Sequence, residues 1–96
     1  MQKENKKPRV SIVIPSYNRD SLVARAITSI LQQTFKDFEI VVVDDASEDK
    51  TEEVVARIKD SRIRYKRHSF RKGASAARNT GIEEARGAVS YTHLTL

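Results

Sequence analysis

Ile40-Val41-Val42-Val43-Asp44-Asp45-Ala46-Ser47 is the stretch that decides the fold, because four β-branched residues run directly into two carboxylates. A continuous run of Val and Ile is typical of a strand buried on both faces, as in a parallel sheet covered by helices. The two aspartates follow at the carboxyl end of this strand, where open α/β sheets bind their ligands. The stretch therefore predicts an α/β fold with an acidic pair at its ligand-binding edge.

The segments on either side of this strand alternate between strand and helix patterns. An earlier strand is expected over Val10–Ile14, ended by Pro15, which has no N–H for a sheet ladder. Apolar residues at helical spacing up to Leu31 predict a helix capped by Asp20 or Ser21. A strand is expected over 39–44, followed after the loop 46–51 by a helix capped by Ser47 or Thr51. A short exposed strand over 63–65 comes next. The last expected elements are a helix over 74–86, with Ala77, Ile82 and Ala85 inward, and a strand from Val89. This βαβαβα order with a final strand predicts a Rossmann-like α/β fold with a mostly parallel sheet.

Length and composition limit the classes of function. The chain has 96 residues, enough for one small domain, and no cysteine, so a disulfide framework or a thiolate metal site is excluded. No apolar run is long enough to span a membrane, and no signal peptide is visible. The net charge of +5 suits a solvated surface or attraction to phosphate groups or a membrane surface. Nucleic acid is not expected as a partner, because no binding motif accompanies the charge and only six aromatic residues are present.

Two polar loops follow the first two strands and should open at the same edge of the sheet. Asp44 and Asp45 can hold a divalent cation, can accept hydrogen bonds from a base or ribose, or can simply turn the chain. The loop Ser16-Tyr17-Asn18-Arg19 offers an aromatic ring that can stack on a nucleobase, or a tyrosine that merely covers the sheet edge. The residues by themselves leave these alternatives open.

Gly73-Ala74-Ser75-Ala76-Ala77-Arg78-Asn79-Thr80-Gly81 is the third polar segment. A glycine before a helix start can present backbone N–H groups to an anion. Arg78, one turn into the helix, can reach a phosphate or point into solvent. The segment lacks the Walker and dinucleotide glycine patterns, and neither His68 nor His93 has a partner at metal-ligand spacing.

Four blocks of the chain together resemble the inverting family 2 glycosyltransferases of the GT-A fold. They are Val10-Ser-Ile-Val-Ile-Pro-Ser-Tyr-Asn-Arg19, Ser29-Ile-Leu-Gln-Gln-Thr-Phe35, Glu39-Ile-Val-Val-Val-Asp-Asp-Ala-Ser47 and the Gly73–Gly81 segment. All four occur in order over about Pro8 to Gly87. The resemblance implies a transferase that uses a nucleoside-diphosphate sugar, most simply a UDP-sugar, in cell-envelope polysaccharide synthesis, with the N-terminal half of a GT-A fold binding the nucleotide.

The same resemblance assigns roles to individual residues. Pro15, Tyr17, Asn18 and Arg19 would line the nucleoside pocket, Asp45 would hold the base with Asp44 beside it, and Arg78 would lie near the diphosphate. The implied domain covers residues 9–89, after a flexible N-terminus over 1–8. The implied localisation is cytoplasmic, with the inner face of the membrane as a further possibility.

The end of the chain departs from the family pattern. The family continues into an Asp-x-Asp motif that holds Mn²⁺ or Mg²⁺, whereas no carboxylate follows Glu84 here. We expect residues 90–96 to be an atypical tail, truncated or altered, so neither a metal ligand nor a catalytic base is assigned. This chain alone is expected to transfer no sugar and to self-associate through an open sheet edge.

Two other functions remain as alternatives. One is a receiver-like signalling domain, in which the acidic pair binds Mg²⁺ beside a phosphorylated aspartate; the third strand, ending in Tyr65-Lys66-Arg67, argues against it. The other is a non-catalytic nucleotide-binding or assembly domain.

Overall fold

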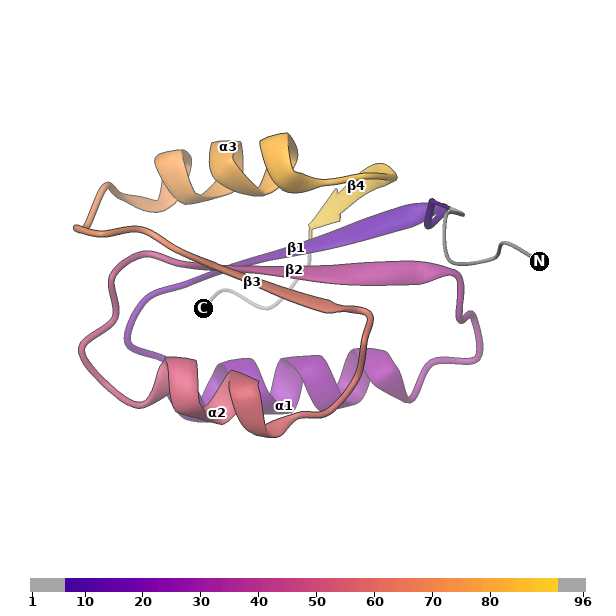
Figure 1. Ribbon diagram of the computed structural model, residues 1–96, viewed down its shortest axis with the longest axis horizontal. Helices are drawn as coiled ribbons and strands as arrows, with labels where there is room; N and C mark the ends of the chain where they lie inside the picture. The colour runs from indigo at the N-terminus through magenta and orange to yellow at the C-terminus, as the bar shows by residue number, and fades with distance from the viewer. Residues whose placement is uncertain (1–6, 92–96) are drawn as a thin grey trace.

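The computed structural model describes residues 7–91, which form three layers. In chain order the elements are β1 (Val10–Ser16), α1 (Asp20–Leu31), β2 (Phe38–Asp44), α2 (Thr51–Arg57), β3 (Ile63–Arg67), α3 (Ala74–Glu84) and β4 (Ala88–Tyr91). The four strands form one sheet in the order β3-β2-β1-β4, and every pairing is parallel. Helices α1 and α2 cover one face of this sheet and α3 covers the other (Figure 1). The predicted α/β fold is therefore confirmed.

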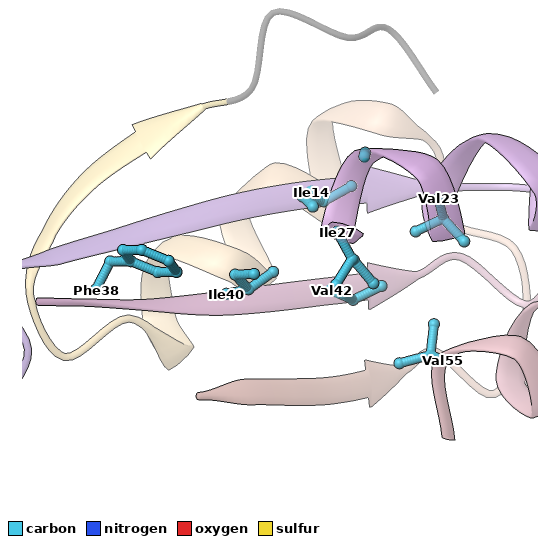
Figure 2. Packing of buried hydrophobic residues seen from close by; sticks show 8 residues of the cluster. Ile14, Val23, Ile27, Phe38, Ile40, Val42 and Val55 are labelled. Carbon is cyan, nitrogen blue, oxygen red and sulfur yellow. The ribbon is translucent and has the colours of Figure 1, made fainter. Parts of the chain in front are cut away.

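Burial on both faces explains why β2 is an unbroken apolar run. All seven of its residues are buried. Alternate side chains enter two separate cores. The core beneath α1 and α2 contains Ile14, Val23, Ala26, Ile27, Phe38, Ile40, Val42 and Val55 (Figure 2). The core beneath α3 contains Val13, Val41, Val43 and Ala77.

Pro15 does not end the first strand, contrary to the prediction, because β1 continues to Ser16. The Ser16 carbonyl accepts a hydrogen bond from the Asp45 N–H on the β2 side, so the backbone of Pro15 faces the β4 side. There β4 pairs with β1 only from Val10 to Val13. The N–H that proline lacks is thus not needed by any ladder among the described residues.

The predicted side-chain caps are also wrong. The residues preceding α1 and α2 are Arg19 and Lys50, and neither makes a side-chain cap hydrogen bond. Asp20 instead begins α1 and accepts hydrogen bonds from the N–H groups of Ser21 and Lys50. The polar side chains near the helix starts thus connect the two loops to each other.

Helix α3 ends at Glu84, two residues before the predicted end, because Ala85 takes an extended conformation (φ −68°, ψ 140°). Ile82, predicted to point inward, is 47% exposed, and Gly81 is the buried residue beside it. Strand β3 is half-buried over its first three residues and exposed over its last two, and it extends to Arg67, since its register with β2 continues to Asp44. Residues 92–96 of the predicted tail and 1–6 of the predicted flexible N-terminus lie outside the described residues.

None of the helices in residues 7–91 has the length and apolar composition that a membrane span requires.

Candidate functional site

A cavity of about 160 Å³ opens at the carboxyl ends of β1 and β2, on the α3 side of the sheet. It is lined by Pro15, Ser16, Tyr17, Arg19, Asp45, Arg71, Ala74 and Ala77. Four residues predicted for the nucleotide site, Pro15, Tyr17, Arg19 and Asp45, thus share one cavity. An engineered cavity of about 150 Å³ in another protein admits benzene, so this volume has room for one six-membered ring.

The loops after β1 and β2 are joined to each other, as their expected position at one sheet edge requires. The Asn18 N–H donates to Ser47 Oγ, and Asn18 Oδ1 accepts from the Glu48 N–H, both at 2.8 Å. Asn18 and Ala46 have positive φ angles of 51° and 63°, a conformation that turns each loop sharply. Asn18, which was predicted to line the nucleoside pocket, holds the two loops together and is not among the residues lining the cavity.

Asp45 is buried at the inner wall of the cavity and is surrounded by hydrogen-bond donors. Its Oδ1 lies 2.8 Å from His68 Nδ1 and accepts from the Lys72 N–H at 2.9 Å, while Oδ2 accepts from the Gly73 N–H at 2.8 Å. Burial by itself would raise the pKa of Asp45, but these hydrogen bonds outweigh it and the pKa lies below its ordinary value. The carboxylate is therefore held ionised.

Asp44 points to the opposite face of the sheet, because successive strand residues alternate. Its side chain is fully buried, accepts hydrogen bonds from the Tyr65 hydroxyl and the Ser47 N–H, and pairs with Arg67 at 3.1 Å. Burial and the neighbouring carboxylate raise the pKa of Tyr65 far above its usual value. The acidic pair is thus split between two faces, and Asp44 does not line the cavity.

Arg71 covers the aromatic ring of the cavity. Its guanidinium carbon lies 4.0 Å from the centre of the Tyr17 ring, and Nε lies 3.9 Å from Asp45 Oδ2. A ring inserted between the two groups would need two van der Waals gaps of about 3.5 Å each. A nucleobase that stacks on this face of Tyr17 must therefore displace Arg71.

The Gly73–Gly81 segment does not present the free N–H group of Gly73 that an anion site at the start of α3 would need. Gly73 has φ 101°, and its N–H is directed at the protein's own Asp45 carboxylate rather than left open for an external anion. Arg78 is exposed on α3 and does not line the cavity. His93 lies outside the described residues.

The described residues do not fit a divalent metal ion. Within residues 7–91 no group of three or more His, Asp or Glu side chains is placed to hold one. Asp44 and Asp45 face opposite sides of the sheet and already accept hydrogen bonds from protein donors. Their adjacency in sequence is therefore no indication of a shared metal.

Sequence reasoning missed His68 and Arg71 as members of this site. The sequence showed His68 only as lacking a partner at metal-ligand spacing, and Arg71 was not singled out. No local pattern distinguishes either residue, because their partners Asp45 and Tyr17 lie in the loops after β2 and β1. Only the return of the chain through β3 brings the 68–73 segment to the cavity.

Comparison with known proteins gives the family. The family model for glycosyl transferase family 2 matches residues 11–92. The UDP-Glc:alpha-D-GlcNAc-diphosphoundecaprenol beta-1,3-glucosyltransferase WfgD of Escherichia coli is 42% identical over 78 residues, which are 81% of this chain and 31% of that protein. The GalNAc(5)-diNAcBac-PP-undecaprenol beta-1,3-glucosyltransferase of Campylobacter jejuni is 40% identical over 83 residues, covering 83% of this chain and 27% of that protein. The chain thus spans less than a third of the length of these relatives.

Solved structures agree with this match. S. aureus TarS residues 1–349, in complex with UDP, superposes with a TM-score of 0.81 at 27% identity over 88% of this chain and 26% of that one. The mannosyltransferase PcManGT from Pyrobaculum calidifontis, in complex with GDP-Man and Mn²⁺, gives a TM-score of 0.75 at 31% identity over 84% of this chain and 25% of that one. The fold, the four sequence blocks and the family match lead to one conclusion: this chain belongs to glycosyl transferase family 2.

Proposed function

We propose that the chain is the nucleotide-binding part of an inverting glycosyltransferase that takes a nucleoside-diphosphate sugar, with uridine as the nucleoside, as its donor. In the complete enzyme the sugar is transferred to an acceptor hydroxyl. The observation that carries the proposal is the cavity that brings Tyr17, Asp45 and Arg71 together at the carboxyl ends of β1 and β2. Support for uridine comes from relatives whose names include UDP-Glc and from the TarS complex with UDP.

The lining residues suit one heterocyclic base. Tyr17 offers a stacking face, and Pro15 and Ala77 offer apolar walls. An ionised carboxylate has about four lone-pair positions, so Asp45, with three protein donors, keeps one for an N–H of the base. Asp44 supports the pocket from the other face by holding Tyr65, Arg67 and the Ser47 backbone.

Titration calorimetry with UDP tests this assignment. We expect Tyr17→Ala to weaken binding by about 1–3 kcal/mol, the range found for aromatic–base stacking. Asp45→Ala should also weaken it, while Tyr17→Phe should retain most of the affinity. Phe35→Ala, which removes an exposed aromatic ring outside the cavity, is the matched control. Equal affinities for the wild type, Tyr17→Ala and Asp45→Ala would show that the assigned pocket is wrong.

Transfer requires groups that this pocket does not supply. A leaving diphosphate gains negative charge as the glycosidic bond breaks, and an acceptor hydroxyl must lose its proton to a base. The family implies Mn²⁺ or Mg²⁺ in the complete enzyme, and the complex of PcManGT contains Mn²⁺. Residues 7–91 hold no group of three or more His, Asp or Glu side chains placed for that metal. We therefore assign the metal ligands and the base to parts of the complete enzyme outside these residues.

We accordingly predict that the 96-residue chain transfers no sugar, even with a UDP-sugar and Mn²⁺ present. The measurement is release of UDP above background, with and without candidate acceptors. Metal-dependent release that Asp44→Asn or Asp45→Asn abolishes would contradict the prediction and make the acidic pair a metal site.

For the complete enzyme we propose a place in the cytoplasm, against the inner face of the membrane. The names of two relatives specify diphosphoundecaprenol acceptors, which are lipid-linked, and the chain carries a net charge of +5. Co-sedimentation with phosphatidylglycerol vesicles at low salt tests the attraction. Equal recovery with uncharged vesicles would contradict it.

A further inference from the structure

A buried histidine connects three parts of the molecule behind the cavity. His68 follows β3 directly and is 5% exposed. Its Nδ1 lies 2.8 Å from Asp45 Oδ1, and its Nε2 lies 2.8 Å from Thr80 Oγ1 on α3. Its own N–H donates to the Asp44 carbonyl at 2.9 Å, which fixes the backbone as well. The ring therefore bridges α3 and the residue that directly follows β2.

The direction of these hydrogen bonds follows from the partners. An ionised Asp45 can only accept, so Nδ1 carries the hydrogen in this pair. In the neutral ring Nε2 is then an acceptor for the Thr80 hydroxyl. Both ring nitrogens are satisfied, and the plane of the ring is set by two bonds that point in opposite directions. The Asp45 carboxylate is held in one rotamer as a result.

That rotamer determines the position of the segment 69–73, here called the Arg71 loop. With Oδ1 held by His68, the carboxylate presents both oxygens to the N–H groups of Lys72 and Gly73. The side chains of Ser69, Phe70, Arg71 and Lys72 are exposed, so the loop has little apolar burial of its own. Its attachment to Asp45 brings Arg71 over Tyr17.

We propose that His68 is a positioning residue of the nucleotide pocket: through Asp45 it fixes the Arg71 loop against Tyr17. The inference rests on the proposed function for its effect on nucleotide, but its effect on the loop can be measured without any ligand. Histidine suits this role better than an apolar residue of the same size, because only a side chain with two polar atoms at opposite positions bridges a carboxylate and a hydroxyl.

Three substitutions separate positioning from packing. His68→Phe keeps a planar aromatic ring, somewhat larger than imidazole, and removes both polar atoms. His68→Asn retains an N–H donor near the position of Nδ1, and His68→Gln carries its amide nearer to the position of Nε2. Ser11→Ala is the control, because Ser11 Oγ serves another buried carboxylate, Glu39, at the opposite end of the sheet. It should lower thermal stability without affecting the pocket.

The first measurement is amide hydrogen exchange of the nucleotide-free chain, and the second is UDP titration. In His68→Phe we expect faster exchange at Lys72 and Gly73, because Asp45 loses the bond that fixes its rotamer. UDP affinity should fall by about tenfold or more, because the proposed charged acceptor for the base is then misplaced. In His68→Asn, amide protection and UDP affinity should both lie close to those of the wild type, and in His68→Gln they should lie between those of His68→Asn and His68→Phe. Ser11→Ala should change neither the exchange at Lys72 and Gly73 nor the UDP affinity.

Unchanged exchange at Lys72 and Gly73 in His68→Phe would overturn the inference. Faster exchange with unchanged UDP affinity would overturn the role of His68 in the pocket and leave a purely structural histidine. A His68→Asn variant whose exchange and UDP affinity match those of His68→Phe would do the same. If the wild type does not bind UDP at all, the proposed function fails, while the exchange data still decide whether His68 holds the loop.

Discussion

Glu39 is a charged residue buried in β2, and its environment explains how the charge is kept there. Its side chain is 1% exposed, accepts from Ser11 Oγ at 2.6 Å and the Arg86 N–H at 2.9 Å, and pairs with Arg64 and Arg86. Burial by itself would raise the pKa, but these donors bring it below the ordinary 4.5. Because the folded-state pKa is the lower one, the ionised carboxylate adds stability that is complete above 4.5 and lost as the pH falls through the folded-state pKa.

We therefore expect Glu39→Gln to lower the free energy of unfolding by about 1–3 kcal/mol near neutral pH, since buried donors lose a charged acceptor. The difference from the wild type should shrink as the pH falls below 4.5, where the wild-type carboxyl also protonates. Urea denaturation between about pH 7 and about pH 3 measures this. Glu83→Gln, on the exposed surface of α3, is the control, and a difference independent of pH would contradict the explanation.

Arg71 supports a second prediction at this scale. An exposed guanidinium over an aromatic ring contributes about 0.5–1 kcal/mol, which a nucleobase must replace in order to stack there. Arg71→Ala should therefore strengthen binding of uridine by about two- to fivefold. The same change should weaken binding of UDP, because a displaced arginine beside a diphosphate binds it. Fluorescence titration with uridine and with UDP measures whether the two affinities change in opposite directions, with Arg25→Ala on α1 as control. Equal changes in affinity for the two ligands would contradict the proposed role of Arg71.

At the scale of elements, the approach of α3 to the sheet depends on Gly81. A Cβ added there would lie 2.3 Å from Val13 Cγ1 on β1, well inside contact distance. Glycine usually weakens a helix by about 1 kcal/mol relative to alanine. Here the missing side chain lets α3 pack directly on β1, which keeps Ala77 and Thr80 at the cavity and at His68.

Gly81→Ala should thus destabilise the chain although it raises helix propensity, by about 1–3 kcal/mol for an overpacked core. Thermal and urea denaturation measure the change. Combining it with Val13→Ala should recover part of the loss, because the clashing methyl groups are removed. Additive losses in the double variant would mean that the contact with Val13 is not the cause.

At the scale of the molecule, the two edges of the sheet differ in character. The outer strand β3 carries Arg64, Lys66 and Arg67, and charged side chains discourage pairing between sheets. Residues 88–90 of β4 carry no charge, and in the described part of the chain β4 pairs only with β1. We therefore expect a second copy of the chain to add a strand at the β4 edge.

We predict that the chain self-associates at high concentration through β4. Static light scattering over a concentration series measures the mass. Val89→Lys, which places a charge on an exposed position of this edge, should shift the equilibrium toward monomer. A wild-type chain that stays monomeric at the highest concentration would rule this out.

The sequence by itself determined the α/β class, the order of the elements and the sheet edge at which the candidate cavity lies. These follow from signals between close neighbours: a continuous Val/Ile run, helical periodicity in α1 and polar loops after β1 and β2. It also led to the family, because four short blocks occur in order. It did not reveal the extent of β1 past Pro15, the caps, or the exposed position of Ile82, since each depends on which face of an element is covered.

Only the tertiary structure decided what the two aspartates do. Strand alternation sends Asp44 to one face and Asp45 to the other, and the donors that hold Asp45 come from positions 23 to 28 residues later. These donors reach Asp45 only because of the register of β3, the turn at Gly73 and the close packing of α3 at Gly81. No local pattern records such contacts, because hydrogen bonds between distant segments form only where the packing of the whole sheet places them.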